Sequence, residues 1–447
     1  MDQVNRYNRQ HLIWGPEGQA KLSGATIAII GEDEFCFPAA LNAALLGLNT
    51  RLLIAQNSTP GSYALDFQLS GKNLGDEYAR ILTSINPLVH VSHIATGLES
   101  AVDKAFLEGA DVIIDVTNNI VSKGIALEFS LERGIPLISA SSVPGFAVVE
   151  SNIFSPHTDA AKDNLLAYPV GALVIELAKR QVMGQFVPDE PLYINPSQSY
   201  PFVQHTEEVI EPPHDLSKKT CLVVGVGGQG SFAIPILIQL GYKVIYMDPD
   251  SVQDHNLNRQ PWYWDSVGQS KAEVCARKHN LVAGYETARA MVQRFDEHTT
   301  IDEEINLVFG FTDTMYSRML LSNFAARRKI PFIAAGSDPG GADISLYVPG
   351  KTSCYTHLYQ SLIPSAKEGE QRARHGCMEN PNAQVVMPNC FAGSLAAVLS
   401  AYLFNENYSP FNGRLLYRPD SDPSFGRLTH PEICSCHSNG PIDLSIN

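Results

Sequence analysis

The chain has 447 residues, more than one ordinary hydrophobic core encloses, so two domains are expected. Hydrophobic residues make up 44% and charged residues 18%, which indicates a globular chain rather than a disordered one. The formal net charge is -15 and there is no block of basic residues, which argues against a nucleic-acid partner.

The sequence also predicts a cytoplasmic protein without a membrane partner. No apolar run reaches the ~18 residues that a bilayer span needs. The N-terminal stretch MDQVNRYNRQHLIWG is polar and lacks the core of a signal peptide. The eight cysteines are too sparse for a disulfide scaffold of this size, so we interpret them as reduced thiols or metal ligands.

The first half alternates predicted strands and helices. Residues 25–31 (ATIAIIG) form a buried strand in this prediction, followed by a helix-like segment at 39–49 and a strand at 50–55. Apolar stretches at 110–119 and 134–142 continue the pattern. Nearly continuous apolar strands are typical of parallel strands that helices cover on both faces.

The second half repeats this arrangement. Strand 219–225 (KTCLVVG), helix 231–241 and strand 243–248 correspond to the first three elements, and stretches 305–314 and 329–337 to the later pair. The predicted fold class is therefore α/β, with two tandem Rossmann-like doubly wound domains.

A proline-rich stretch separates the two halves. Residues 184–218 contain six prolines, which exclude regular helix and favour an extended connection. We place the domains at 1–200 and 219–447, with 201–218 as the linker.

One glycine-rich loop has the features of a phosphate site. Gly225, Gly227, Gly228 and Gly230 follow a predicted strand and open a helix, so that the backbone can approach a phosphate at the helix N-terminus. Asp248 ends the next strand, where a carboxylate accepts hydrogen bonds from ribose hydroxyls. This pattern alone also fits NAD and a dehydrogenase.

The corresponding loop of the first half is unsuited to phosphate. Residues 31–36 read GEDEFC, which places three carboxylates and bulky side chains where glycines are needed. Their charge repels an anion. We therefore interpret the first half as a copy without nucleotide, although another ligand in its crevice remains an alternative.

Polar and charged residues downstream of Asp248 distinguish ATP from NAD. Arg259 and Lys271 supply two cations close to the ribose carboxylate in sequence, which a triphosphate needs and a nicotinamide does not. Asp313 follows the predicted strand INLVFG, so it should point into the ligand crevice, where a carboxylate suits Mg²⁺. A solvated charged loop is the alternative.

These motifs resemble the adenylation domain of the ThiF/MoeB/HesA/E1 superfamily. The resemblance covers residues 219–340 and rests on GVGGQG, DPD, NLNRQ, GQSK and FTDTMYSR. It implies ATP and Mg²⁺ as cofactors and a catalytic role for Arg259, Lys271 and Asp313. The implied nucleotide-binding residues are Gly225, Gly227, Gly228, Gly230, Asp248, Asp250, Asn256, Arg259, Gln260, Lys271 and Asp313.

The opening RYNRQ at 6–10 resembles the start of these domains, in which an arginine reaches across a dimer interface. The resemblance implies an intrachain E1-like pseudo-dimer, in which the inactive first half supplies Arg9 to the active site of the second. A salt bridge at the interface is the alternative role for Arg9. Homodimerisation beyond this pseudo-dimer is left open.

Two C-x-x-H pairs suggest a structural Zn²⁺ site. Cys354 and His357 form one pair, and Cys434 and His437 the other, which suits a tetrahedral site. Cys436 competes with His437 as the fourth ligand. The superfamily often has C-x-x-C at both places, and four unrelated polar residues are the alternative.

Cys377 is a candidate nucleophile in the stretch that corresponds to a crossover loop. Arg372, Arg374 and His375 would favour its thiolate. Some members of the superfamily that modify peptides need no cysteine, so this role stays open. Cys390 is expected to be buried at the start of a helix.

The predicted function is ATP-dependent adenylation of a carboxylate on a peptide or small protein. A fused inactive half and no room for the extra domains of large E1 enzymes favour maturation of a ribosomal peptide antibiotic, in which a nitrogen nucleophile attacks the adenylate. The resemblance includes the members that make microcin C and pantocin A. The alternatives are activation of a ubiquitin-like or sulfur-carrier protein and a non-catalytic nucleotide-binding scaffold.

Overall fold

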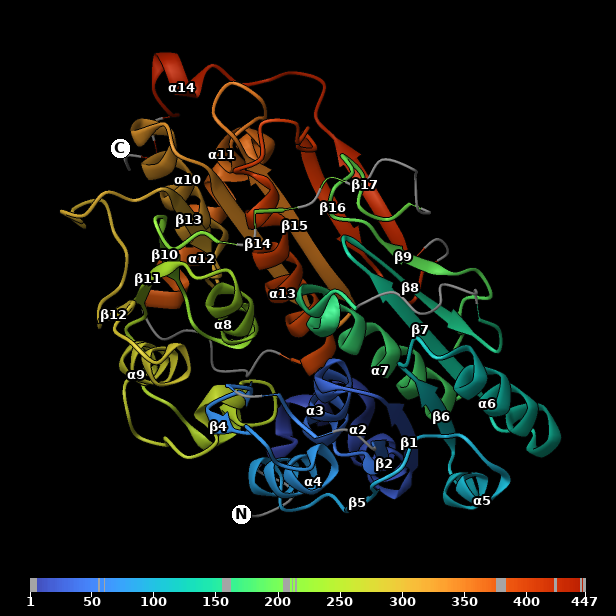
Figure 1. The fold of residues 1–447 in the computed structure, drawn as a ribbon. Helices are drawn as coiled ribbons and strands as arrows, with labels where there is room; N and C mark the ends of the chain where they lie inside the picture. The colour runs from blue at the N-terminus through green and yellow to red at the C-terminus, as the bar shows by residue number, and fades with distance from the viewer. Residues whose placement is uncertain are drawn as a thin grey trace.

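The computed structural model describes residues 6–54, 57–59, 61–154, 162–203, 210, 212–213, 215–374, 383–421, 424–442 and 444. They fold into two mixed sheets with helices packed around them (Figure 1). This arrangement confirms the predicted fold class of two doubly wound α/β units in one chain. In the described part of the chain, no helix combines the length and the apolar character that a membrane span requires.

The first sheet has the strand order β5-β2-β1-β6-β7-β8-β9. Its first five strands are parallel, and β8 and β9 are antiparallel additions. The strands are β1 (Thr26–Gly31), β2 (Asn49–Ile54), β5 (Val91–Ile94), β6 (Val112–Asp115), β7 (Leu137–Val143), β8 (Phe146–Ser151) and β9 (Leu192–Ile194). The helices of this half are α2 (Asn8–Gly24), α3 (Phe37–Leu46), α4 (Leu74–Ile85), α5 (Ala101–Lys104), α6 (Ile120–Arg133) and α7 (Ala167–Met183), and a hairpin is formed by β3 (Tyr63–Ala64) and β4 (Phe67–Gln68).

The second sheet repeats this topology, with the order β12-β11-β10-β13-β14-β15-β16-β17. The strands are β10 (Thr220–Val224), β11 (Lys243–Met247), β12 (Ala288–Met291), β13 (Leu307–Gly310), β14 (Phe332–Asp338), β15 (Gly341–Tyr347), β16 (Gly413–Tyr417) and β17 (Phe425–Thr429). The helices are α8 (Gly228–Gln239), α9 (Lys271–Ala283), α10 (Met315–Arg328), α11 (Tyr355–Leu358), α12 (Ile363–Arg374), α13 (Val386–Tyr402) and α14 (Cys436–Asn439).

Helices of both halves meet in the layer between the two sheets (Figure 1). Helix α13 of the second half packs against α7 and α3 of the first, and also against its own α8. Every residue of α13 is buried, as is nearly all of α7. This burial explains why α13 carries no charged residue, whereas the buried Glu176 of α7 pairs with Lys179 and Arg180 of the same helix at 2.7 and 2.9 Å. The two halves therefore share one continuous hydrophobic core.

The proline-rich stretch between the halves is partly built into the sheet of the first half. Strand β9 pairs with β8, and Phe202 further along stacks on Phe425 of β17 with ring centroids 4.0 Å apart. The start of the connection thus runs from β9, at the edge of the first sheet, to β17, at the edge of the second.

The glycine-poor loop of the first half is filled by the protein itself. Its residues Phe35 and Cys36 are buried, and Asp33 accepts a hydrogen bond from the backbone N–H of Phe35. Lys162 lies 3.5 Å from Glu32 and 3.3 Å from Asp33, so a cation of the chain itself pairs with two of the three loop carboxylates. Among the described residues, Lys162 and the backbone N–H of Phe35 thus already pair with carboxylates of this loop.

Candidate active site

The site lies where the loops after β10, β11 and β13 meet. Val224, at the end of β10, is level with Met247 of β11 and with Gly310 of β13. The residues that follow the three strands therefore reach the same edge of the sheet, which is the ligand-binding edge of doubly wound folds. A cavity of about 540 Å³ opens there.

The first loop needs glycine for two separate reasons. Gly225 adopts φ 88°, and a Cβ at this position would lie 2.5 Å from the carbonyl oxygen of Phe311. A Cβ on Gly230 would lie 2.3 Å from the carbonyl oxygen of Gly225. A side chain at Gly225 would therefore push the loop away from the residue that follows β13, and one at Gly230 would push the start of α8 away from the loop.

Asp248 stabilises this loop as well as facing the cavity. Its Oδ2 accepts a hydrogen bond from the backbone N–H of Val226, and its Oδ1 accepts one from Asp250, both at 2.8 Å. Burial raises the pKa of Asp248, and the positive charge of Lys271 opposes that rise. Each carboxylate oxygen can accept a second hydrogen bond, so ribose hydroxyls remain suitable partners.

The predicted cations gather around the same cavity. Lys271 opens α9 and lies 3.0 Å from Asp250, while Arg259 donates to the carbonyl oxygen of His255 at 2.8 Å. Burial, followed by the charges of Arg259, Arg9 and Lys271, lowers the pKa of His255. The site is therefore electropositive and suited to a polyanion.

Arg9 of the first half lines this cavity together with residues of the second half. Burial lowers its pKa and the negative charge of Asp313 opposes that shift. The backbone of Arg9 is held in place because its carbonyl oxygen accepts from Gln384, in the stretch leading to α13, and Arg6 donates to the carbonyl oxygen of Leu257. The N-terminal segment thus lies between the two halves.

Most of the residues singled out from the sequence line the cavity together. They are Arg9, Gly225, Gly227, Gly228, Asp248, Asp250, Asn256, Arg259, Gln260, Lys271 and Asp313. Gly230 is not among the lining residues and lies in the first turn of α8, in contact with the backbone of Gly225. Cys377 lies outside the described residues, as do the side chains of the three neighbours expected to activate it, and Cys390 is buried within α13.

One buried acceptor in the cavity wall fits a ligand. The Oε1 atom of Gln260 is buried and has no hydrogen-bond partner among the described residues. Buried polar atoms are normally satisfied, so a donor group on a bound molecule, such as a nucleotide hydroxyl or amine, would complete this one.

Sequence reasoning missed several lining residues, including His255, Arg294, Arg318, Gln384 and Asn389. Asn389 comes from α13 and approaches the glycine loop so closely that a Cβ on Gly228 would lie 2.4 Å from its Oδ1. No local motif marks this residue, because its position depends on how α13 packs against α8. Arg318, by contrast, is the last residue of the motif FTDTMYSR, and its presence in that motif could have marked it as a site residue.

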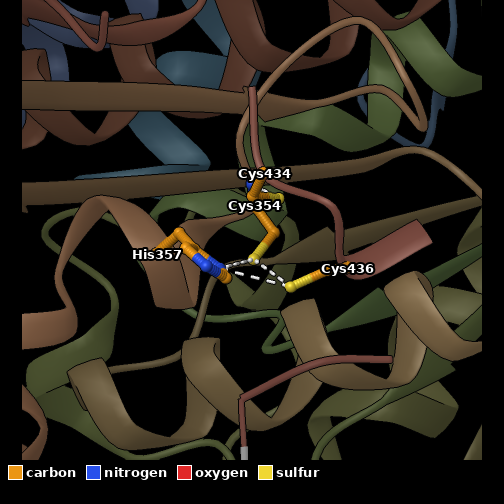
Figure 2. Close-up of side chains that lie close together, drawn as sticks. All are labelled: Cys354, His357, Cys434 and Cys436. Carbon is orange, nitrogen blue, oxygen red and sulfur yellow. Dashed lines mark hydrogen bonds between the residues drawn. The ribbon is translucent and has the colours of Figure 1, made fainter. Parts of the chain in front are cut away.

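A second cluster lies away from the cavity and consists of Cys354, His357, Cys434 and Cys436 (Figure 2). One ligand atom of each lies within 4.8 Å of the others. The Nδ1 atom of His357 is 3.4 Å from Sγ of Cys354 and 3.2 Å from Sγ of Cys436. Three sulfurs and one imidazole form a donor set that fits tetrahedral Zn²⁺. The side chain of His437 lies outside the described residues.

The glycine loop, the carboxylate of Asp248 and the clustered cations form the kind of site at which doubly wound α/β proteins bind nucleotides. Residues 207–424 match the model of the ThiF family. This match covers a little under half of the chain, and the glycine loop, Asp248, Arg259, Lys271 and Asp313 all lie within it.

Two curated relatives illustrate the likeness. The chain is 28% identical over 200 residues to "Adenylyltransferase and sulfurtransferase UBA4" of Yarrowia lipolytica, which covers 44% of this chain and 50% of that one. It is 26% identical over 261 residues to "Ubiquitin-like modifier-activating enzyme 5" of Caenorhabditis elegans, covering 52% and 61%. The matches thus span about half to three fifths of these relatives.

Among solved structures, the chain is similar to E. coli MccB in a crystal structure with succinimide. The TM-score is 0.42 with 23% sequence identity, covering 50% of this chain and 67% of MccB. MccB has also been solved with ATP, and that structure has a TM-score of 0.41 with 22% identity, covering 50% and 67%.

Proposed function

We propose that this chain is an ATP-dependent adenylating enzyme that activates a carboxylate on a peptide or small protein. The observation that supports this most directly is the convergence of Arg9, Arg259, Lys271 and Asp313 on one cavity beside a glycine loop. Three cations and one carboxylate suit a triphosphate with a metal ion, whereas NAD requires no such charge.

In this proposal the substrate carboxylate attacks the α-phosphorus of ATP. The bond from that phosphorus to the bridging oxygen breaks, and pyrophosphate leaves as the acyl-adenylate forms. Arg259 and Lys271 neutralise the phosphates, and Arg9 adds positive charge from the first half where negative charge accumulates. Related arginines in phosphoryl transfer accelerate the reaction by about 10³–10⁵.

Asp313 would hold Mg²⁺ next to the phosphates. Its carboxylate is exposed to the cavity at the C-terminal end of β13, and carboxylate oxygen is the ligand that Mg²⁺ prefers. Mg²⁺ held there would supply positive charge that neutralises the negative charge developing on the leaving pyrophosphate.

For the substrate, we propose a ribosomal peptide whose adenylate is attacked by a nitrogen nucleophile in antibiotic biosynthesis. The asymmetry of the site supports this, because a fused half with a filled loop leaves one dedicated active site per chain. The alternative is a ubiquitin-like or sulfur-carrier protein, which the likeness to the two curated relatives favours. A short precursor peptide or a small carrier protein encoded beside this gene would distinguish the two.

Cys377 would be required only if product formation passes through a covalent intermediate. Cys377→Ala should then abolish product while ATP–pyrophosphate exchange continues. Unchanged product formation would exclude this role.

We further propose that Cys354, His357, Cys434 and Cys436 hold a structural Zn²⁺. Four protein ligands leave no open coordination position for chemistry, so the metal would tie the C-terminal segment to the start of α11.

The decisive assay is carboxylate-dependent exchange of labelled pyrophosphate into ATP. Asp313→Ala should abolish exchange, and Asp302→Ala, at an exposed position outside the cavity, should leave it unchanged. ATP with Mg²⁺ should also raise the Tm, whereas NAD should not. A Tm increase with ATP but no exchange with any carboxylate would support the non-catalytic scaffold instead.

A further inference from the structure

Helix α12 carries a buried carboxylate that lies outside the lining of the cavity. Glu370 is 4% exposed, and its two oxygens have different partners. Oε2 accepts a hydrogen bond from the hydroxyl of Thr314 at 2.7 Å, and Oε1 lies 3.4 Å from Arg294. Both partners line the cavity, so one side chain connects two parts of its wall.

Thr314 is the residue next to Asp313 and caps α10. Its Oγ1 accepts a hydrogen bond from the backbone N–H of Ser317 at 3.2 Å. The same oxygen donates to Glu370, so the carboxylate fixes the orientation of the capping hydroxyl. A charged acceptor makes this hydrogen bond stronger than one between neutral groups.

The residue on the other side of Asp313 is also held by a side chain. Arg318 donates from Nε and Nη2 to the carbonyl oxygen of Thr312, at 3.0 and 2.7 Å. The residues on both sides of Asp313 are therefore held by hydrogen bonds. Arg318 of α10 binds Thr312, and Glu370 of α12 binds Thr314.

We propose that Glu370 is a positioning residue, which holds Asp313 in place for Mg²⁺ by fixing Thr314. This inference rests on the proposed function, because it assigns Asp313 to the metal. Loss of groups that hydrogen-bond directly to a metal ligand typically weakens metal binding by 10–100-fold. Glu370 acts through a neighbouring residue, so we expect a smaller effect of about 3–10-fold.

The experiment measures by calorimetry how the affinity for ATP depends on Mg²⁺ concentration, which requires no turnover. Glu370→Ala should raise the Mg²⁺ concentration at half-maximal effect by about 3–10-fold, and Glu370→Gln, which retains an acceptor, by less. Glu368→Gln, on an exposed face of the same helix, is the matched control and should behave as wild type.

A double variant tests whether Glu370 acts through Thr314. Thr314→Val removes the hydroxyl. The double variant Thr314→Val with Glu370→Ala should need no more Mg²⁺ for its half-maximal effect than the more strongly affected of the two single variants. A merely structural role would lower the Tm without changing the Mg²⁺ dependence. If Glu370→Ala does not fold, the double variant Thr314→Val with Glu370→Gln provides the same comparison.

The outcomes separate the two claims. Wild-type Mg²⁺ dependence in every folded Glu370 variant, or additive effects in the double variant, would overturn the positioning role and leave the proposed function intact. If the wild-type chain itself binds ATP without any dependence on Mg²⁺, the proposed function and this inference fail together.

Discussion

Burial and the neighbouring positive charge of Arg9 lower the pKa of Arg259 to about 10. The two arginines belong to different halves of the chain, and the negative charge of Asp313 opposes the shift. Holding two guanidinium groups near each other in a partly buried cavity is unfavourable unless an anion lies between them. The arrangement is therefore suited to bind phosphate, and it exists only because the two halves pack together.

Arg9 should contribute mainly to the chemical step. We expect Arg9→Ala to lower the rate of ATP–pyrophosphate exchange by at least about 10²-fold, because it removes positive charge where negative charge develops. Arg9→Lys should recover part of the rate. ATP affinity should change much less than the rate.

The matched control is Lys21→Ala, at an exposed position near the end of the same helix, α2. It should not alter exchange. Equal exchange rates in Arg9→Ala and wild type would support the alternative in which Arg9 forms only an interface salt bridge.

The hairpin of the first half should stabilise the interface between the halves. Asp66 lies 3.0 Å from Nζ of Lys278 on α9, whose side chain is 0% exposed, and also accepts from Nε1 of Trp264. Asp66→Asn should lower the free energy of unfolding by about 1–3 kcal/mol, less than for a wholly broken buried pair, because Asp265 also pairs with Lys278 at 2.7 Å.

Urea denaturation measures this effect. Asp302→Asn, at an exposed position, should change the midpoint little. If Asp66→Asn proved as stable as wild type, the ion pair would not contribute to holding the halves together.

His279 should make stability depend on pH between about 4 and 6.5. Burial lowers its pKa from 6.5 to about 4, and its Nδ1 is 2.8 Å from the hydroxyl of Tyr246. Between these values the unfolded chain binds a proton that the folded chain does not. The free energy of unfolding should therefore fall as the pH falls from 6.5 to 4, by about 3 kcal/mol in total.

Unfolding measured across this range in wild type and His279→Gln checks the assignment. In His279→Gln, most of the fall in the free energy of unfolding that we attribute to His279 should disappear. In His298→Gln, at an exposed position, that fall should remain. A wild-type slope that persists in His279→Gln would assign the dependence to other groups.

The cysteine cluster should bind one zinc ion per chain. Cys354→Ser should lose the metal, measured by elemental analysis, and lower the Tm, because metal binding contributes to folding. Cys436→Ser and His437→Ala separate the two candidates for the fourth ligand, and we expect Cys436→Ser to lose zinc. Zinc retained in Cys436→Ser and lost in His437→Ala would reverse that assignment.

The sequence predicts the strands and the loop chemistry because both depend on local patterns. Gly225 and Asp313 follow apolar strands, and parallel strands bring their ends to the same edge. Asn389 and Glu370 could not be predicted in this way. Asn389 reaches the cavity, and Glu370 reaches residues that line it, through packing of α13 and α12 against helices far away in the sequence, and neither lies in a motif.

Arg9 is an intermediate case. Its role was inferred from a resemblance, but its position in the cavity depends on the packing of the halves and on the contacts of Arg6 and Gln384. The fourth metal ligand could not be predicted, because spacing alone fits both Cys436 and His437.

A structure of the chain with ATP and Mg²⁺ tests the central claim most directly. We predict one nucleotide per chain, bound at the glycine loop after β10, with its phosphates in contact with Arg259, Lys271 and the Arg9 side chain of the first half. A nucleotide bound in the first half, or phosphates that do not contact these side chains, would contradict the account of one active site completed by both halves.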